Sequence, residues 1–259
     1  VGLNSIPVLL ILVVAVVIWA AEATRRVLQR SAWGPSVALM AGLVPVVLSI
    51  GIRLFDVGVH EFGFAQREHL FAVMVIPFLV SRWQRWHDGV PPTGSAISIG
   101  IAAGVTACLK PHFVVAVLAC EAYLLATRRR VGPLFGAELL AFAAVGALYA
   151  AHFAVVPSPM REAFFGRWLP LLAHHYRAYD RPLVDLLRPE AVLAALVAVS
   201  PWLLSTAKRN GADSRHESLV RVVGVFTMAC VAMYIAQGRG FSYHLLPAAF
   251  GAAFVIALM

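Results

Sequence analysis

Apolar runs long enough to cross a lipid bilayer recur along the whole sequence, and short polar segments separate them. A membrane-spanning helix needs about 20 mostly apolar residues, whereas soluble domains contain roughly 45–50% apolar residues. Here 61% of the 259 residues are hydrophobic and only 13% are charged. The sequence therefore predicts an all-α, polytopic transmembrane helix bundle that forms a single domain over residues 1–259.

We predict about nine spans, several of which are short for a hydrocarbon core about 30 Å thick. We expect the short ones to extend into their polar flanks or to lie against other helices rather than lipid. We also expect the chain to be truncated at both ends, because Val1 is not an initiator methionine and Met259 closes an apolar run without flanking charge. The predicted spans are Ile6–Ala23, Pro35–Leu54, Leu70–Val80, Ser95–Leu109, Pro111–Thr127, Leu134–Val156, Ala191–Thr206, Leu219–Ala236 and Leu245 onward.

Lysine and arginine residues in the short loops predict the orientation of the bundle. If the first span runs from outside to inside, four basic loops fall in the cytoplasm, and we expect a multi-pass protein of the plasma membrane of a bacterium, its inner membrane. The outer segments are then about residues 55–69, 157–190 and 237–244, together with the short turn "LKPH" at Lys110. This topology accounts for the net charge of +8 without nucleic acid as a partner, since no basic tail is present. The cytoplasmic basic residues are Arg25, Arg26, Arg30, Arg82, Arg85, Arg128, Arg129, Arg130, Lys208, Arg209 and Arg215.

Cations and imidazoles gather on the predicted outer face, where membrane topology gives no reason for them. Arginine and lysine make charge-assisted hydrogen bonds to phosphate, so this set is typical of a site for an anionic headgroup. The alternative is that these side chains only reach ordinary lipid headgroups at the interface. The outer set comprises Arg53, Arg67, Lys110, Arg239, His60, His69, His112, His152, His174, His175 and His244.

Lys110 and Arg239 are the two sharpest candidates in this set. Lys110 stands between two apolar runs and precedes Pro111, whose ring interrupts a continuous helix. A charged side chain at such a break is a functional candidate, although it also fits an ordinary turn between two short spans. Arg239 lies between Gly238 and Gly240, which allow a positive φ or a close backbone approach.

Acidic residues on the same face are candidates for a general base, which must lie within reach of the proton it removes. Asp56 and Glu61 rank first, because their segment also holds Arg67 and His69. Solvation of the loop, or pairing with nearby arginines, explains these carboxylates equally well. The outer carboxylates are Asp56, Glu61, Glu68, Glu162, Asp180, Asp185 and Glu190.

Two further groups of residues are assigned structural roles. The segment from Pro157 to Glu190 mixes aromatic residues with arginines, which predicts an amphipathic helical loop lying on the membrane. Glu121 and Glu138 lie inside spans near their cytoplasmic ends, so we expect them to be paired or to extend towards the interface rather than to be catalytic. The sequence has no P-loop, no zincin motif and no nucleophile elbow, and no metal-ligand spacing identifies a metal or other cofactor. A requirement for a divalent metal is left open.

Three short motifs in order along the chain resemble those of the GT-C superfamily of membrane glycosyltransferases. They read "AQREHLFAVMVIPFLV", "CLKPHFVV" and "RGFSYHLLPA". The resemblance is to the branch that uses polyprenyl-phosphate sugars and includes protein mannosyltransferases and the aminoarabinose transferase of lipid A. It implies inverting transfer of a sugar from a polyprenyl-phosphate donor to an extracytoplasmic acceptor, which is a lipid, a glycan or a protein.

The resemblance also implies roles for individual residues. Lys110 and Arg239 match phosphate-binding positions, Tyr243 and His244 lie beside them, and Arg67 and His69 match the beginning of the corresponding span. Tyr243 alone also fits an ordinary aromatic belt at the membrane interface. The family's acidic motif on a large first outer loop has no counterpart here, so the base lies outside this chain or is Asp56 or Glu61.

Two other functions remain open at this stage. An O-antigen ligase or polymerase also combines many spans with outer arginines and histidines, but it takes a diphosphate-linked glycan as donor. A lipid or sugar transporter is the third possible function. A transporter is expected to have charged residues at mid-membrane and internal repeats, whereas the polar residues here gather at one interface.

Overall fold

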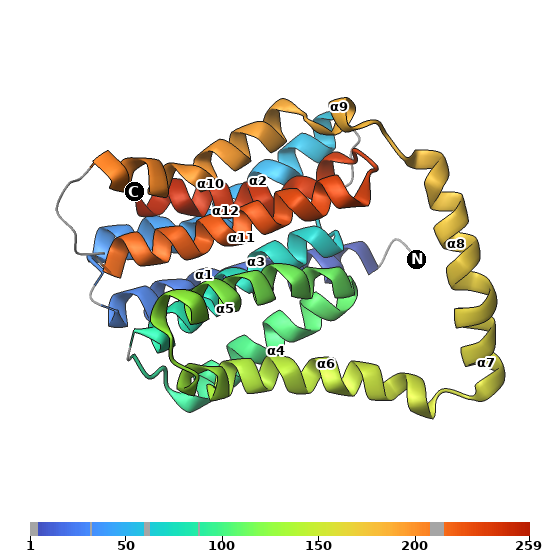
Figure 1. The fold of residues 1–259 in the computed structure, drawn as a ribbon, viewed down its shortest axis with the longest axis horizontal. Helices are drawn as coiled ribbons and strands as arrows, with labels where there is room; N and C mark the ends of the chain where they lie inside the picture. Colours follow the sequence, from blue (N-terminus) through green and yellow to red (C-terminus); the bar gives the residue numbers. More distant parts are fainter. Residues whose placement is uncertain (1–4, 32, 60–62, 88, 208–214) are drawn as a thin grey trace.

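A computed structural model describes residues 5–31, 33–59, 63–87, 89–207 and 215–259, and the regular secondary structure in this part is helical throughout (Figure 1). Long helices make up the bundle, and shorter helical segments connect them. The bundle helices are α1 (Ser5–Arg30), α2 (Pro35–Val59), α3 (Arg67–Trp86), α4 (Thr93–Leu109), α5 (Val114–Arg128), α6 (Ala137–Val155), α10 (Pro189–Ala207), α11 (Arg215–Gln237) and α12 (Leu246–Leu258). The connecting segments include η1 (Pro111–Phe113), η2 (Gly132–Phe135), α7 (Ser158–Glu162), η3 (Ala163–Trp168), α8 (Leu169–Tyr176), η4 (Arg177–Tyr179), α9 (Leu183–Leu186) and η5 (Ser242–Leu245).

The predicted all-helical membrane architecture is confirmed at this level. Among the described residues, five helices are long and apolar enough to cross a bilayer, which indicates a multi-pass membrane protein. Three shorter apolar helices accompany them. The five long spans are Pro7–Arg30, Pro35–Arg53, Pro111–Arg128, Ala137–Val155 and Arg215–Gln237, and the shorter ones are Thr93–Leu109, Pro189–Leu204 and Ser242–Leu258.

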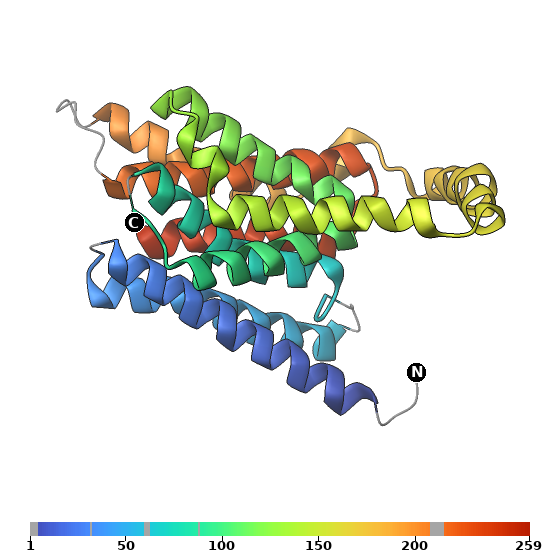
Figure 2. The same ribbon diagram turned by 90° about the horizontal axis from the view of Figure 1, so that it is seen from below.

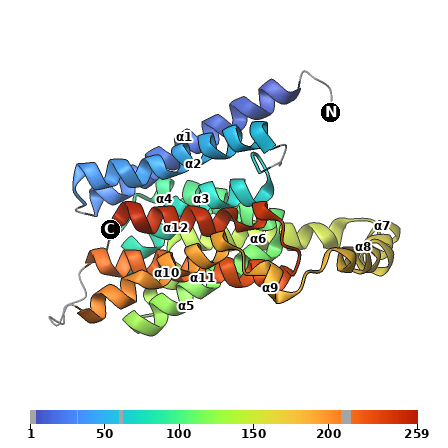
Figure 3. The ribbon, with the colours of Figure 1, turned by 90° about the horizontal axis from the view of Figure 1, so that it is seen from above.

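Helix α3 lies at the centre of the bundle. It contacts α1, α4, α5, α11 and α12, and its side chains Phe71, Phe78 and Trp83 are buried. Figures 2 and 3 show α1 and α2 as a layer on one side of α3, with α10, α11 and α5 on the other side. Functional groups on α3 are therefore held by helices on several sides.

Successive helices alternate in direction, so their connections gather at two opposite ends of the bundle (Figure 1). The end where α4 finishes and α3 and α12 begin is here called the Lys110 end. The opposite end, where α3 finishes, is called the Arg82 end. The described parts of the predicted outer segments fall at the Lys110 end, and those of the predicted cytoplasmic loops fall at the Arg82 end.

The break between α4 and α5 follows directly from the sequence. Lys110 has φ −142° and ψ 99°, an extended conformation that ends α4 before the short helix η1. The ring of Pro111 disfavours helical geometry in the residue before it, so Lys110 is the position at which α4 must stop.

The segment from α7 through η3 to α8 forms an arm that stands off the bundle at the Lys110 end (Figures 1 and 2). The helical part of the prediction for residues 157–190 is thereby confirmed. Large apolar side chains of the arm are exposed, and arginines alternate with them. The exposed apolar side chains include Met160, Phe164, Phe165, Trp168, Leu171 and Leu172.

The third predicted span extends into its polar flanks, as expected for so short a run. The apolar run Leu70–Val80 is the middle of α3, which begins at Arg67, continues to Trp86 and buries Arg82. A helix can carry an arginine into the core when carboxylates on neighbouring helices pair with it, and Glu121 and Glu138 do so here.

Candidate functional site

Glu68 is the centre of a buried polar cluster at the Lys110 end. It lies in the first turn of α3 and its side chain is 1% exposed. The Lys110 ammonium forms an ion pair with its Oε1 atom, and Nε2 of His244 lies 3.4 Å from the same oxygen. Three elements far apart in the sequence therefore bring a carboxylate, an amine and an imidazole together.

Each of these side chains is positioned by local backbone chemistry. Glu68 follows the start of α3, where the helix N-terminus favours a negative charge. His244 lies in η5, after a loop in which Gly238 and Gly240 adopt φ of 70° and 67°. These positive values confirm that the two glycines supply left-handed backbone on either side of Arg239.

Hydrogen bonds from the segment before α10 hold that glycine loop in place. The backbone N–H of Arg181 donates to the carbonyl of Gly238 at 2.6 Å, and Nη1 of Arg188 donates to the carbonyl of Gly240 at 3.1 Å. The loop thus presents Arg239 and His244 from a fixed backbone.

Positive charge exceeds negative charge around Glu68. Burial lowers the pKa of the Lys110 ammonium, and the charges of Arg67 and Arg239 lower it further, while the ion pair with Glu68 opposes both effects. Arg67 is exposed, whereas Arg239 is partly buried and its guanidinium carbon lies 4.0 Å from the centre of the Tyr176 ring. The Tyr243 ring lies 5.8 Å from the Lys110 amine.

Four buried polar atoms in this cluster have no hydrogen-bond partner among the described residues. Buried polar atoms in proteins are nearly always hydrogen-bonded, so a concentration of exceptions calls for an explanation. The four atoms combine one acceptor from a carboxylate with nitrogens from two histidines and one arginine. They are Oε2 of Glu68, Nδ1 of His244, Nε2 of His112 and Nε of Arg239.

An apolar groove of about 620 Å³ begins beside this cluster. His112 lines one part of it, and the charges of Lys110 and Glu68 act on that histidine. The remaining walls come from α5 and α11 and are almost entirely apolar, including Val115, Ala232 and Met233. A polar cluster and a groove suited to hydrocarbon therefore adjoin one another.

The structure brings together most, but not all, of the residues predicted from the sequence. Lys110, Arg239, Arg67, Tyr243 and His244 surround Glu68, as the contacts above describe. The other three predicted residues are His69, Asp56 and Glu61, of which His69 makes its contacts elsewhere. Glu61 and the side chain of Asp56 lie outside the part of the chain that the structure describes.

His69 is engaged elsewhere in the fold. Its Nδ1 accepts a hydrogen bond from the backbone N–H of Ala65 at 3.0 Å, and its Nε2 lies 2.8 Å from the hydroxyl of Ser49. Ala65 has a positive φ of 61°, so this histidine secures a tight turn just before α3. Its geometry favours a structural role.

Sequence reasoning gave Glu68 and His112 too little weight. Both belong to the predicted outer set, but Glu68 was ranked below Asp56 and Glu61 because those residues share a loop with Arg67 and His69. The missing signal is spatial, since the partners of Glu68 lie 42 residues away at Lys110 and later still at His244.

A second buried charged cluster lies at the Arg82 end. Arg82, 1% exposed, donates to Glu121 at 2.6 and 2.8 Å and to Glu138 at 2.8 Å. Arg85 donates to Glu138 at 2.6 and 2.9 Å, and Nε1 of Trp86 donates to Glu121 at 3.1 Å. Of the two roles expected for the glutamates, pairing is the one observed, and all four of their carboxylate oxygens accept hydrogen bonds.

The described residues of the two clusters do not include the set of ligands that a metal site needs. In the residues that the structure describes, no group of three or more histidine, cysteine, aspartate or glutamate side chains is arranged to hold a metal ion. The chemistry available at the Lys110 end is that of one carboxylate with several cationic donors.

Comparison with known proteins adds no identification. No known protein family, no curated protein and no solved structure matches this chain significantly.

Proposed function

We propose that this chain belongs to a membrane glycosyltransferase that moves a sugar from a polyprenyl-phosphate donor to an acceptor on the extracytoplasmic side. In this proposal the five long spans, the three shorter apolar helices and α3 cross the membrane, which makes nine spans. The Lys110 end faces outward and the basic Arg82 end faces the cytoplasm of a bacterial cell, in accord with the positive-inside rule.

The observation that carries the proposal is the excess of cationic donors beside an apolar groove. Lys110, Arg239 and Arg67 lie around one carboxylate, and the groove between α5 and α11 begins at His112. A polyprenyl phosphate has the same two parts, an anionic head and a long hydrocarbon chain. The cations would hold the phosphate and the groove would take the first part of the chain.

The chemistry would proceed as a single displacement. The acceptor oxygen bonds to the anomeric carbon of the sugar while the bond from that carbon to the phosphate oxygen breaks, and the lipid phosphate leaves with the electron pair. Preorganised cations stabilise the negative charge that develops on this leaving group. The acceptor proton passes to Glu68, whose Oε2 atom has no partner among the described residues.

Donor binding also explains why Lys110 and Glu68 are paired in the free protein. The buried ammonium needs a counter-charge, and Glu68 provides it. When a phosphate arrives, Lys110 can share its three N–H donors with the new anion, and Glu68 becomes a stronger proton acceptor as the lysine turns away from it.

The test follows release of polyprenyl phosphate by the full-length protein in lipid, supplied with a synthetic polyprenyl-phosphate sugar and a membrane extract as acceptor. Release should require acceptor and should fall at least about 100-fold in Lys110→Ala, because one charge-stabilising donor is removed. Arg30→Ala, an exposed arginine of α1 near the Arg82 end, is the matched control and should keep full activity.

Other outcomes distinguish the alternatives. Consumption of a diphosphate-linked glycan instead would identify an O-antigen ligase or polymerase, which shares the outer cationic site but uses another donor. No reaction with either donor, together with movement of lipid or sugar across the membrane, would identify a transporter. Full activity in Lys110→Ala would remove the phosphate-site assignment.

A further inference from the structure

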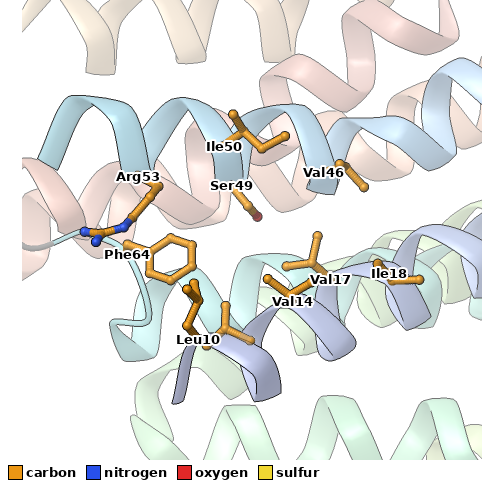
Figure 4. A pocket seen from close by; sticks show the side chains of 10 residues that line it. Leu10, Val14, Val17, Ile18, Val46, Ser49, Ile50, Arg53 and Phe64 are labelled. Carbon is orange, nitrogen blue, oxygen red and sulfur yellow. The ribbon is translucent and has the colours of Figure 1, made fainter. Parts of the chain in front are cut away.

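A second apolar cavity, separate from the groove at His112, lies between α1 and α2. This slot has a volume of about 330 Å³ and is lined from α1 by Leu10, Val14 and Ile18 and from α2 by Val46 and Ile50 (Figure 4). Most of these side chains are exposed, in helices that are apolar enough to cross the bilayer. Membrane hydrocarbon is therefore the medium that the slot faces.

One end of the slot carries a positive charge. Figure 4 shows the Arg53 and Phe64 side chains together at one end, with Ile18 and Val46 towards the other, and the Arg53 guanidinium carbon lies 5.8 Å from the Phe64 ring centre. In the sequence, Arg53 also lies near the end of the apolar run Pro35–Leu54, just before Asp56 and His60. An arginine at the end of a span lies at the depth of lipid phosphates, where a single cation favours an anionic lipid.

Among the described residues, the rest of the slot lining offers little polar surface to a ligand. Ser49 is the other polar side chain of this described lining, and its hydroxyl donates to the carbonyl of Pro45 at 2.5 Å. Nε2 of His69 lies 2.8 Å from the same hydroxyl. Because Nδ1 of His69 accepts from Ala65, its Nε2 is the protonated nitrogen and donates to Ser49. The hydroxyl is thus already hydrogen-bonded as a donor and as an acceptor, and the other described lining residues apart from Arg53 are apolar.

The shape of the slot favours an elongated apolar occupant. Its lining on α1 runs from Leu10 to Ile18, which corresponds to about 12 Å along the helix. An acyl chain of a membrane lipid is elongated and apolar, and such chains surround helices that cross a bilayer.

We propose that the slot between α1 and α2 binds one acyl chain of an anionic phospholipid of the surrounding membrane, with the lipid phosphate at Arg53. The site goes beyond the proposed glycosyltransferase function and requires no turnover. The slot is also connected to the proposed active site. The Ser49–His69 hydrogen bond joins the slot wall to the start of α3, next to Glu68.

The test measures lipid binding directly, with the purified chain in nanodiscs of phosphatidylcholine that contain a photo-crosslinking phosphatidylglycerol labelled in its acyl chain. Val14→Trp places a large ring in the slot and should lower crosslinking to α1 and α2 at least tenfold. Leu12→Trp, also on α1 and exposed but outside the slot lining, is the matched control and should leave crosslinking unchanged.

Headgroup selectivity is tested with Arg53→Gln. The wild-type chain should prefer labelled phosphatidylglycerol over an equally labelled phosphatidylcholine, and this preference should fall about fivefold in the variant, as expected for loss of one interfacial cation. Equal crosslinking in Val14→Trp and wild type would overturn the chain site. An unchanged preference in Arg53→Gln would overturn the role of Arg53.

Discussion

The two ends of α3 hold two buried charged clusters that differ in how completely their polar atoms are hydrogen-bonded. Glu68 and Arg82 are 14 positions apart on one helix, which corresponds to about 21 Å. At the Arg82 end every carboxylate oxygen of Glu121 and Glu138 accepts a hydrogen bond. At the Lys110 end, one carboxylate faces several cations, and four polar atoms are without partners in the described part of the chain. Buried charge that is fully paired stabilises a fold, whereas buried charge left incomplete is typical of a binding site.

The largest expected effect is at the Arg82 end. Glu138→Ala leaves Arg82 without one of its two buried carboxylates and removes the carboxylate partner of Arg85, so it should lower the free energy of unfolding by about 3–5 kcal/mol. Glu190→Ala is the matched control, since that glutamate is 67% exposed and lies 3.8 Å from Arg188; it should change stability by less than about 1 kcal/mol. Unfolding in detergent or lipid measures both, and equal stability of the two variants would mean that the paired cluster is dispensable.

Loss of the carboxylate charge at the Lys110 end should affect turnover more than folding. Glu68→Gln removes the proposed proton acceptor and should lower transfer by about 100- to 1,000-fold. Its cost in stability should be smaller than that of Glu138→Ala, because the Lys110 side chain is 12% exposed and can turn towards water, whereas Arg82 is 1% exposed. Turnover and unfolding are measured on the same preparation. If Glu68→Gln lowered stability as much as Glu138→Ala, Glu68 would be a structural residue and the two clusters would not differ in role.

The difference between the clusters also explains what the sequence could and could not predict. The break at Lys110 was predictable, because Pro111 acts on its immediate neighbour. The burial of Arg82 in α3 was not, since this arginine is stabilised by Glu121 and Glu138, which are 39 and 56 residues away on other helices. Local patterns predict helices and breaks, whereas the pairing of buried charges depends on helix packing.

The same limit applies to the candidate site. The cations Lys110 and Arg239 stood out because they contradict the positive-inside rule, which is a property of the sequence alone. Glu68 did not stand out among seven outer carboxylates, because only the fold brings His244 and Lys110 to it. Burial separates Glu68 from exposed acids such as Glu190, and burial was not visible before the structure.

The charge state of Lys110 should make donor binding depend on pH, and we expect an effect of intermediate size. Its pKa is lowered from 10.5 by burial and by Arg67 and Arg239, with Glu68 opposing. The ammonium is therefore present below this lowered pKa and is lost as the pH rises through it, at a lower pH than for a free lysine. Binding of a short-chain polyprenyl phosphate should weaken over that alkaline range. Lys110→Arg should hold binding to higher pH, because an arginine keeps its charge there; identical pH profiles would show that Lys110 does not contact the phosphate.

The smallest expected effect concerns the arm at the Lys110 end, which has no equivalent among the described residues of the Arg82 end. The Tyr176 ring lies 4.0 Å from the Arg239 guanidinium carbon, a cation–π contact that orients the arginine. Tyr176→Leu removes it while keeping an apolar side chain on the arm, so the KM for the polyprenyl-phosphate donor should rise about three- to tenfold, with little change in kcat, which corresponds to the energy of such a contact. Tyr149→Leu is the control, because its ring packs against Phe153 within α6. Equal KM values in the two variants would mean that the arm does not position Arg239, and the asymmetry between the ends would then rest on the buried cluster alone.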